Sequence, residues 1–230
     1  MLTSAPADLK SRLASSYDSI ADVYNKWALD NSSTRLSYLS KLLSHLCFGL
    51  HGRLSRPVRI LDLGGGCGDP VTKSLLEHDA NISIVLNDMS PAQISKARDM
   101  FHSDVAKGRL QLEEGDMTTL SFGSEEFDAI MGTYSLIHLP RDQQTLMLGL
   151  ISGWLKPGGL VLATFLEEET TGMVMDKWMG DGGWMFWSSW GKERTLELVK
   201  GNGFEVLLEE VPNEGEVDAR FLWVLGRKEE

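Results

Sequence analysis

Cysteine and long apolar segments are both scarce in this sequence. Its 230 residues include two cysteines, Cys47 and Cys67, which are too few for a disulfide framework or a structural zinc site. We expect both thiols to be reduced, as is usual in the cytosol. No apolar run approaches the roughly 18 residues of a membrane span, and no basic-then-apolar signal opens the chain. The sequence therefore predicts a cytoplasmic protein with no membrane partner.

Positive charge is also scarce. The chain carries 22 lysines and arginines against 33 aspartates and glutamates, for a net charge of −11, and its basic residues never form a long run. Because proteins bind nucleic-acid phosphates with clustered lysine and arginine, no nucleic-acid partner is expected. A hydrophobic content of 42% and a charged content of 24% are ordinary for a globular chain. At this length we expect one domain with a full core.

The most informative feature that is present is a glycine-rich turn. The apolar run Val58–Leu63 leads into residues 64–68, four of which are glycine, and a segment compatible with a helix, Val71–His78, follows. Glycine lets a ligand approach bare backbone, and a helix start offers free N–H groups. A dinucleotide fingerprint would need glycine where Asp69 stands, and a carboxylate there would repel a pyrophosphate. The chain also has no Tyr-x-x-x-Lys pair. The turn therefore predicts an uncharged or cationic nucleoside rather than NAD or FAD.

Strand and helix patterns alternate after this turn, which predicts an α/β fold with a mostly parallel, seven-stranded sheet and helices on both faces. Two helices, near 7–30 and 36–50, form an N-terminal helical appendage over residues 1–55, ahead of a domain over 56–230. Ligands should bind outside the carboxyl ends of the strands. Strands are expected near 58–63, 82–87, 109–114, 127–134 and 159–165, with a C-terminal β-hairpin from 204–211 and 219–227, and helices near 70–78, 91–104, 141–154 and 192–202.

Four segments of this domain carry motifs in a fixed order: Ile60-Leu-Asp-Leu-Gly-Gly-Gly-Cys-Gly68, Val85-Leu-Asn-Asp-Met-Ser90, Glu114-Gly-Asp-Met117 and Leu155-Lys-Pro-Gly-Gly159. Together they resemble the motifs of the class I S-adenosylmethionine-dependent methyltransferases. The resemblance covers about residues 56–166, and it looks closest to the small-molecule branch that includes the ubiquinone and menaquinone biosynthesis enzymes. No Asn-Pro-Pro or Asp-Pro-Pro sequence occurs, unlike in enzymes that methylate the amino groups of nucleic acids.

The resemblance implies a Rossmann-like methyltransferase sheet and S-adenosyl-L-methionine as cofactor. It also implies methyl transfer by in-line displacement to a small, apolar or aromatic metabolite. No metal is implied, and the sequence shows no clear cluster of metal-ligand carboxylates. The alternative is a methyltransferase-fold protein that binds the cofactor without methylating, such as a cyclase or a partner-binding module, because fold does not determine function.

The resemblance also implies where the cofactor lies. Asp88 would accept hydrogen bonds from the ribose hydroxyls, and Asp116 from the adenine amino group. Asp62 would position the turn or reach the methionine ammonium. The alternatives are that Asp62 satisfies backbone N–H groups and that Asp116 only forms a turn. The expected cofactor residues are Tyr17, Tyr24, Asp62, Gly64, Gly65, Gly66, Asp88, Met89, Asp116, Met117 and Tyr134.

His138, after the fourth expected strand, is the candidate catalytic residue. A pKa near neutrality would suit deprotonation of a hydroxyl or thiol, and members that this sequence resembles often carry a histidine there. The alternative is a structural histidine bound to backbone. Tyr17 and Tyr24 belong to a stripe at helical spacing that core packing would explain, but their segment also resembles an N-terminal lid over the cofactor.

Residues 167–190 break the alternation of strands and helices. They hold four of the seven tryptophans, interleaved with methionine and glycine. Because exposed tryptophan is costly, we expect an insertion over the carboxyl end of the sheet that forms the wall of the acceptor pocket. A hydrophobic satellite core or a dimer face are the alternatives, so the chain is expected to be a monomer or a homodimer. The expected substrate residues are Trp27, Ser135, His138, Trp178, Trp184 and Trp187.

Overall fold

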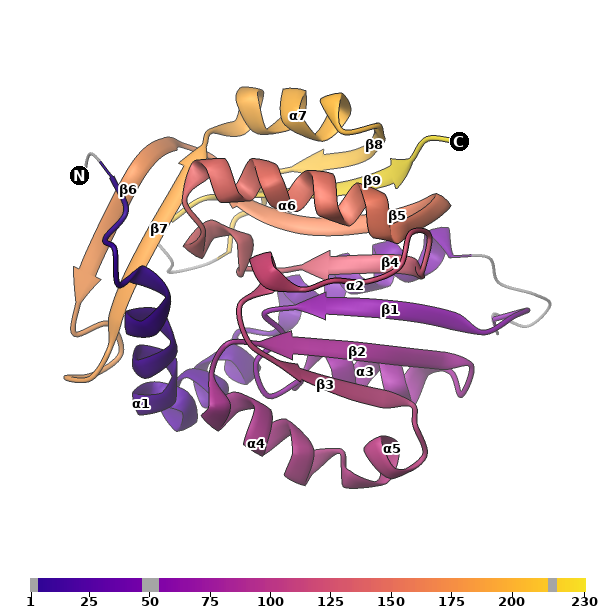
Figure 1. Ribbon diagram of the computed structural model, residues 1–230, viewed down its shortest axis with the longest axis horizontal. Helices are drawn as coiled ribbons and strands as arrows, with labels where there is room; N and C mark the ends of the chain where they lie inside the picture. Colours follow the sequence, from indigo (N-terminus) through magenta and orange to yellow (C-terminus); the bar gives the residue numbers. More distant parts are fainter. Residues whose placement is uncertain (1–3, 47–53, 215–218) are drawn as a thin grey trace.

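The computed structural model of the protein describes residues 4–46, 54–214 and 219–230. Its centre is a seven-stranded sheet in the order β3-β2-β1-β4-β5-β9-β8 (Figure 1). β1 to β5 pair in parallel, and β9 lies antiparallel to both β5 and β8. The predicted mostly parallel α/β sheet with a C-terminal hairpin is therefore confirmed. The strands are β1 (Val58–Leu63), β2 (Ile82–Asp88), β3 (Leu110–Glu114), β4 (Phe127–Gly132), β5 (Leu155–Leu166), β8 (Phe204–Glu210) and β9 (Phe221–Lys228).

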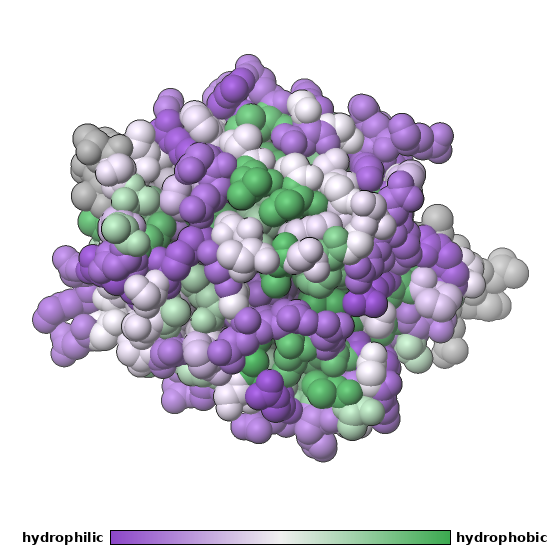
Figure 2. Space-filling view, in the orientation of Figure 1, coloured by the Kyte–Doolittle hydropathy of each residue, from purple (hydrophilic) through white to green (hydrophobic). Residues whose placement is uncertain are grey.

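Helices cover both faces of the sheet, as predicted. Successive strand residues alternate between two apolar clusters, so Ile60 packs with α2, α3 and α4, while Leu61 packs with α6 and α7 on the other face. Figure 2 shows one face of the molecule, where hydrophilic residues surround patches of apolar ones. The helices are α1 (Leu9–Asp30), α2 (Ser33–His45), α3 (Val71–His78), α4 (Pro91–Met100), α5 (His102–Ala106), α6 (Arg141–Trp154) and α7 (Lys192–Gly201), with short 3₁₀ turns η2 (Met117–Thr119) and η3 (Leu136–His138).

α1 lies across the carboxyl ends of the central strands. The arrowheads of β1, β2 and β4 in Figure 1 point toward it. Its apolar residues Leu9, Leu13 and Ile20 pack against the segment 184–186. On its other side, Asp18 accepts a hydrogen bond from the Ala92 N–H at 3.0 Å, at the start of α4. The N-terminal appendage therefore covers the edge of the sheet where ligands are expected.

The segment 167–190 is more regular than its sequence indicates. It forms an antiparallel hairpin of β6 (Glu169–Asp176) and β7 (Trp184–Trp190), separate from the main sheet. β7 packs against α1 and η3, and much of it is buried, whereas Met173, Val174 and Met175 of β6 are exposed. In Figure 1 the hairpin stands at the end of the sheet toward which β1, β2 and β4 point, and the irregular conformation predicted for this segment is corrected to a β-hairpin.

Several predicted boundaries were wrong; β5, for example, begins at Leu155 rather than near 159. The helix expected at 91–104 divides into α4 and α5, because the chain turns at Phe101 to bury that ring beneath Gly68. β4 ends at Gly132 rather than 134, since Tyr134 takes a left-handed conformation with φ 58°. The second helix spans 33–45 and ends at the extended residue Leu46; residues 47–50 of the 36–50 prediction, with Cys47, lie outside the described residues.

Candidate active site

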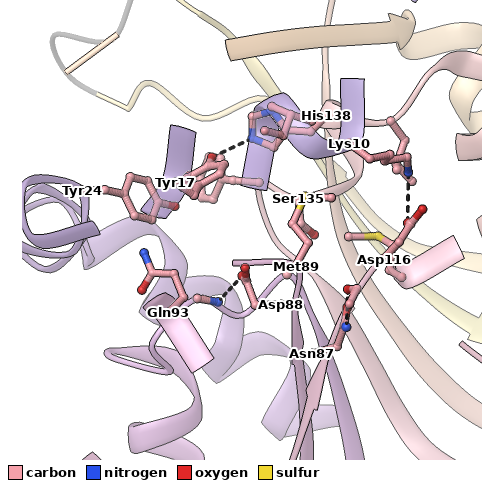
Figure 3. Close-up of a pocket in the computed structure, with 17 residues that line it drawn as sticks. Lys10, Tyr17, Tyr24, Asn87, Asp88, Met89, Gln93, Asp116, Ser135 and His138 are labelled. Carbon is pink, nitrogen blue, oxygen red and sulfur yellow. Dashed lines mark hydrogen bonds and ion pairs between the residues drawn. The ribbon is translucent and has the colours of Figure 1, made fainter. Parts of the chain in front are cut away.

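A cavity lies between α1 and the carboxyl ends of β1, β2 and β4 (Figure 3). It brings together the glycine turn, the ends of β2 and β3, the segment after β4, and one face of α1. Most of the predicted cofactor residues therefore lie in one place. The cavity is lined by Lys10, Leu13, Tyr17, Tyr24, Gly64, Gly66, Asn87, Asp88, Met89, Gln93, Gly115, Asp116, Met117, Tyr134, Ser135, His138 and Leu139.

The glycine turn shapes the floor of this cavity. Gly64 and Gly66 have φ values of 66° and 61°, in the left-handed region that favours glycine. A Cβ on Gly64 would stand 2.5 Å from the Cβ of Ser135, whereas a Cβ on Gly66 would meet only Gln93, at 3.9 Å. The backbone at Gly66 is thus open to the cavity, and a ligand can approach it closely.

Asp88 ties the turn to the end of β2. Its Oδ2 accepts a hydrogen bond from the Gly66 N–H at 2.8 Å, and its Oδ1 accepts one from the Ser90 N–H at 2.9 Å. Each carboxylate oxygen can still accept from another donor, which suits the two neighbouring hydroxyls of a ribose. Burial raises the pKa of Asp88 to about 6, against the opposing effect of these hydrogen bonds.

Asp62 lies beneath the glycine turn rather than on the main cavity wall. Its Oδ2 accepts a hydrogen bond from the Thr72 hydroxyl at 2.9 Å, and burial raises its pKa to about 6. Asp62 and Gly65 line a smaller hollow, which shares Gly64 and Gly66 with the main cavity. From this position Asp62 can hold the glycine turn in place, and it can also contact the ammonium group of a ligand.

Asp116 and Met117 lie at the far end of the cavity, after β3. Asp116 Oδ1 accepts hydrogen bonds from the Thr118 N–H and from Lys10 Nζ of α1, each at 3.0 Å. Burial would raise the pKa of Asp116, but these hydrogen bonds outweigh it, and the pKa lies below its usual range. Asp116 therefore caps η2, which agrees with the turn-forming role given as its alternative. It also lines the cavity. The ion pair with Lys10 was not predicted.

His138 lies between Tyr17 and the backbone of β7. Its Nδ1 is 2.8 Å from the Phe186 carbonyl oxygen, which can only accept, so Nδ1 carries the proton. Nε2 therefore accepts a hydrogen bond from the Tyr17 hydroxyl at 2.9 Å (Figure 3). Burial lowers the pKa of His138 to about 4, so the ring is neutral at pH 7. The same burial raises the pKa of Tyr17, which keeps its proton.

An aromatic cluster stands behind Tyr17 and His138. The ring centres of Trp178 lie 6.3 Å from Tyr17, 5.9 Å from Tyr24 and 6.1 Å from Trp187. Trp187 is 6.1 Å from His138, and Trp27 is 6.2 Å from Tyr24. The structure thus brings Trp27, Trp178 and Trp187 next to the cavity but does not place them on its wall.

Trp184 does not belong to this cluster, and its predicted place in the acceptor pocket is corrected. It is 8% exposed and packs with Leu9, Leu13 and Ile20 of α1. The Arg12 guanidinium lies 3.9 Å from the centre of its ring. Trp184 therefore holds the hairpin against α1.

Ser135 and Tyr134 are bound to other parts of the protein. The Ser135 hydroxyl donates a hydrogen bond to the Leu63 carbonyl at 2.7 Å, which joins the ends of β1 and β4. The Tyr134 hydroxyl donates to Glu214 Oε2. Both residues also line the cavity, where Tyr134 was expected to bind the cofactor and Ser135 the acceptor.

Several cavity residues were not predicted. Lys10, Leu13 and Leu139 reach the cavity only through tertiary packing. Asn87 and Gln93 could have been suspected, since each lies close in sequence to Asp88. Within the described part of the chain, Asn87 Oδ1 and Gln93 Nε2 are buried without a hydrogen-bond partner. The cavity thus offers one unused acceptor and one unused donor, as a polar nucleoside would require.

Comparison with known proteins identifies the domain. Residues 60–159 match the family model described as a methyltransferase domain. The ubiquinone/menaquinone biosynthesis C-methyltransferase UbiE of Idiomarina loihiensis is 27% identical over 153 residues, which are 62% of this chain and 57% of that protein. The matched segments span between 23% and 57% of the curated relatives' own lengths.

Two solved structures superpose over nearly the whole chain. The 1,6-didemethyltoxoflavin-N1-methyltransferase of Burkholderia thailandensis, solved with S-adenosylhomocysteine, has a TM-score of 0.69 at 19% identity and covers 100% of this chain and 93% of its own. The cyclase SpnF has a TM-score of 0.71 at 19% identity and covers 99% of this chain and 98% of its own. At these identities the likeness shows the fold. Residues 60–159 thus match a methyltransferase domain, and the fold of the chain is that of the class I S-adenosylmethionine-dependent methyltransferases.

The cofactor of this class is S-adenosylmethionine, and the residues present fit it. Asp88 can bind the ribose, Asp116 and Met117 lie where the adenine is expected, and the bare backbone at Gly66 leaves room between them. The unused donor and acceptor of Gln93 and Asn87 add polar partners. Across residues 4–46, 54–214 and 219–230, no group of His, Cys, Asp or Glu is arranged to hold a metal ion. No helix in these ranges is long and apolar enough to cross a membrane.

Replacing Asp88 by alanine should weaken S-adenosylhomocysteine binding by about 1–3 kcal/mol, because hydrogen bonds to a buried carboxylate are lost. Calorimetry measures the dissociation constant. In the wild type, affinity should be full well above pH 6 and fall as the pH drops through about 6, since the ionised form accepts the hydroxyls. Asp62 titrates over the same range.

Asp99→Ala on the exposed face of α4 is the matched control and should bind as the wild type does. An unchanged dissociation constant in Asp88→Ala, with the melting temperature also unchanged, would show that another group holds the ribose.

Proposed function

We propose that this protein transfers a methyl group from S-adenosylmethionine to a small, apolar or aromatic metabolite. The observation that carries the proposal is the place of His138: a neutral imidazole with its Nε2 lone pair directed at Tyr17, on the wall of the cofactor cavity. A proton acceptor and a cofactor site thus lie in one cavity. UbiE and the toxoflavin enzyme are named as methyltransferases of small molecules, which favours the same class of acceptor.

The residues of the chain mainly align the acceptor and exclude water. Bound S-adenosylmethionine supplies a methyl group on a sulfonium, which is already a good leaving group. α1 covers the cavity and is fastened on both sides, by Lys10 to Asp116 and by Asp18 to α4. A site covered in this way favours in-line displacement, because it would hold the acceptor close to the methyl group and keep water out.

His138 Nε2 would take the proton of a hydroxyl, thiol or amine acceptor. In the structure the Tyr17 hydroxyl occupies that position at 2.9 Å. The acceptor would displace Tyr17 or pass its proton through it. A pKa of about 4 makes His138 a weak base, so its main contribution would be to orient the acceptor's proton and to receive it as the methyl group is transferred.

The aromatic cluster of Trp27, Trp178 and Trp187 supports an apolar or aromatic acceptor. These rings are only partly buried and stand directly behind Tyr17, Tyr24 and His138. Tryptophan offers a large apolar surface with few rotatable bonds to restrict. The acceptor would lie between this cluster and the cavity.

Methyl-labelled S-adenosylmethionine tests the proposal. The protein is incubated with the labelled cofactor and a metabolite extract, and products that gain the label are found by mass spectrometry. A labelled small molecule together with S-adenosylhomocysteine is the expected result. If the protein binds S-adenosylhomocysteine but labels nothing from extracts of widely different composition, methyl transfer would be contradicted.

Cofactor binding without methylation is the second candidate function. The observation that favours it is the superposition with the cyclase SpnF over nearly the whole chain, together with the low basicity of His138. The two candidates differ in one product. A methyltransferase releases S-adenosylhomocysteine in proportion to acceptor consumed, whereas a cyclase would convert its substrate with no change in the amount of S-adenosylmethionine.

Two of the three tryptophans of β7, Trp184 and Trp187, should differ in whether their loss affects acceptor binding or the stability of the fold. Trp187→Ala should raise the Michaelis constant of the acceptor with little change in S-adenosylhomocysteine affinity, because Trp187 stands beside His138. Trp184→Ala should instead lower the free energy of unfolding by about 3–5 kcal/mol, as for a buried aromatic ring. Steady-state kinetics and chemical denaturation measure these effects. A dimer that dissociates in the Trp187 variant during size-exclusion chromatography would point to a subunit interface instead.

A further inference from the structure

One edge of β7 pairs with no strand in the part of the chain that the structure describes. Its other edge pairs with β6, in a sheet of two strands. The open edge faces η3 and the start of α6 (Figure 1). Because buried backbone carbonyls need hydrogen-bond donors, the groups that bind this edge have to come from side chains.

His138 and Gln144 supply two of these donors. His138 Nδ1 donates to the Phe186 carbonyl oxygen at 2.8 Å, and Gln144 Nε2 donates to the Ser188 carbonyl oxygen, also at 2.8 Å. Carbonyls two residues apart on a strand point to the same side, so both bonds lie along the open edge. The histidine of the candidate active site therefore shares its attachment to β7 with Gln144.

Gln144 and Ser188 also bind the residue that follows His138. The Leu139 carbonyl oxygen accepts a hydrogen bond from Gln144 Nε2 at 3.0 Å and another from the Ser188 hydroxyl at 2.6 Å. Nε2 also lies 3.2 Å from the Ser188 hydroxyl oxygen. Both side chains are buried. This cluster of hydrogen bonds thus fixes the distance between η3 and β7 directly beside His138.

The orientation of the Gln144 amide follows from its surroundings. The carbonyl oxygens of Leu139 and Ser188 face one end of the amide, and since they can only accept, that end is the nitrogen. The other end, Oε1, is buried and has no hydrogen-bond partner among the described residues. An unpartnered buried acceptor is costly, and a methionine of similar length would avoid it. What glutamine contributes here is therefore its N–H groups.

The position of the proton on His138 depends on the same geometry. The hydrogen bonds of the two ring nitrogens decide which of them carries the proton. The Phe186 carbonyl holds the proton on Nδ1 and leaves the Nε2 lone pair directed at Tyr17. Burial lowers the pKa of His138, and the bond to Phe186 opposes that effect. If β7 moved away from η3, the proton could move to Nε2, which could then no longer accept one.

We propose that Gln144 and Ser188 are positioning residues, which keep His138 in the tautomer that can accept a proton at Nε2. Neither residue lines the cavity, so they act through the Phe186 carbonyl. The proposal deepens the role given to His138 in the proposed function and rests on it. The tautomer can be measured without an acceptor, so the two proposals can fail separately.

NMR spectroscopy of the histidine rings tests the proposal. In protein labelled with ¹⁵N at its five histidines, the spectra distinguish a ring nitrogen that carries a proton from one that carries a lone pair. The His138→Gln variant lacks one set of signals and thereby assigns it. At pH 7, well above the pKa of about 4, His138 of the wild type should carry its proton on Nδ1 alone.

Gln144→Met and Ser188→Ala each remove part of the hydrogen-bond cluster. In each variant His138 should become a mixture of tautomers, and kcat should fall by about 10- to 100-fold, a part of what a general base contributes. S-adenosylhomocysteine affinity should stay unchanged, because neither residue lines the cavity. The two substitutions lie on different elements, so if one variant does not fold, the other still tests the cluster.

Ser189→Ala is the matched control for Ser188→Ala. Ser189 is the next residue of β7 and is equally buried, but its hydroxyl donates to the Leu166 carbonyl at 2.8 Å, on the opposite face of the strand. The control should lower the melting temperature about as much as Ser188→Ala does. It should leave the tautomer of His138 and kcat at their wild-type values.

A wild type with the proton of His138 on Nε2 would overturn the proposal at once. So would a proton that stays on Nδ1 in both variants, or a control that shifts the tautomer as much as Ser188→Ala does. A shifted tautomer with unchanged kcat would also overturn it, since the positioning would then not serve the reaction. If no methyl group is transferred, the proposed function is contradicted, and the tautomers of the variants still decide whether Gln144 and Ser188 position His138.

Discussion

Replacing His138 by alanine should lower kcat by about 10²- to 10⁴-fold and leave S-adenosylhomocysteine affinity nearly unchanged. The reason is that Nε2 of His138, on the cavity wall, accepts a hydrogen bond from the Tyr17 hydroxyl, whose proton can move. The pH dependence of kcat is a second and more specific test. With a pKa of about 4, His138 is already neutral at pH 6. The kcat of the wild type should therefore show no step near the usual histidine pKa of about 6.5.

His138→Gln separates base catalysis from hydrogen bonding. Glutamine keeps one N–H to donate and one oxygen to accept, as His138 does toward Phe186 and Tyr17, but it cannot take a proton. If His138 acts as a base, the glutamine variant should be as slow as the alanine variant. If His138 only positions the acceptor, glutamine should restore much of the rate. Full activity of the alanine variant at an unchanged melting temperature would contradict both roles.

Replacing Gly64 by alanine should cost about 2–5 kcal/mol, shared between the stability of the fold and the affinity for the cofactor. A left-handed φ of 66° is unfavourable for alanine by roughly 1–2 kcal/mol. The new Cβ would stand 2.5 Å from the Cβ of Ser135, and such overpacking costs about 1–3 kcal/mol more. Relief of this clash would displace the turn from Asp88. Chemical denaturation and calorimetry together measure the two parts.

Gly153→Ala is the matched control for this substitution. Gly153 lies in α6, and a Cβ there would meet nothing within 4 Å. Because glycine is a poor helix former, this variant should be as stable as the wild type or more stable by about 0.5–1 kcal/mol. A Gly64→Ala protein that matched the wild type in both stability and cofactor affinity would show that the turn is free to rearrange.

Local sequence was sufficient to predict most of the fold. β1, the glycine turn and α3 follow one another within about twenty residues, and each is specified by its own pattern of apolar residues and glycine. The start of α4 was equally local: Ser90 caps the helix by accepting from the Gln93 N–H, and Pro91 stands at its first position. The break at Phe101 was missed because it depends on the packing of the Phe101 ring against Gly68, which is distant in the sequence.

The hairpin β6–β7 shows what the amino-acid composition of a segment cannot predict. Four tryptophans among glycines and methionines indicated that something must cover the rings, but not which ring would face which neighbour. In the structure Trp184 packs on α1 while Trp187 stands beside His138. That difference depends on the register of the hairpin and on where it docks, neither of which is encoded in the spacing of the tryptophans.

The sequence by itself determined the fold class and the S-adenosylmethionine cofactor, and it predicted a nucleoside at the glycine turn with Asp88 as the residue for the ribose. These are properties of contiguous segments, where spacing translates directly into strand, turn and helix. The tertiary structure alone decided the state of His138, whose proton position follows from a carbonyl 48 residues later and a tyrosine 121 residues earlier. It also placed Lys10 against Asp116, 106 residues away, and brought Arg35 to the hollow beside the turn. Such pairings depend on how helices dock on a sheet, and docking is a property of surfaces that form only once the chain has folded.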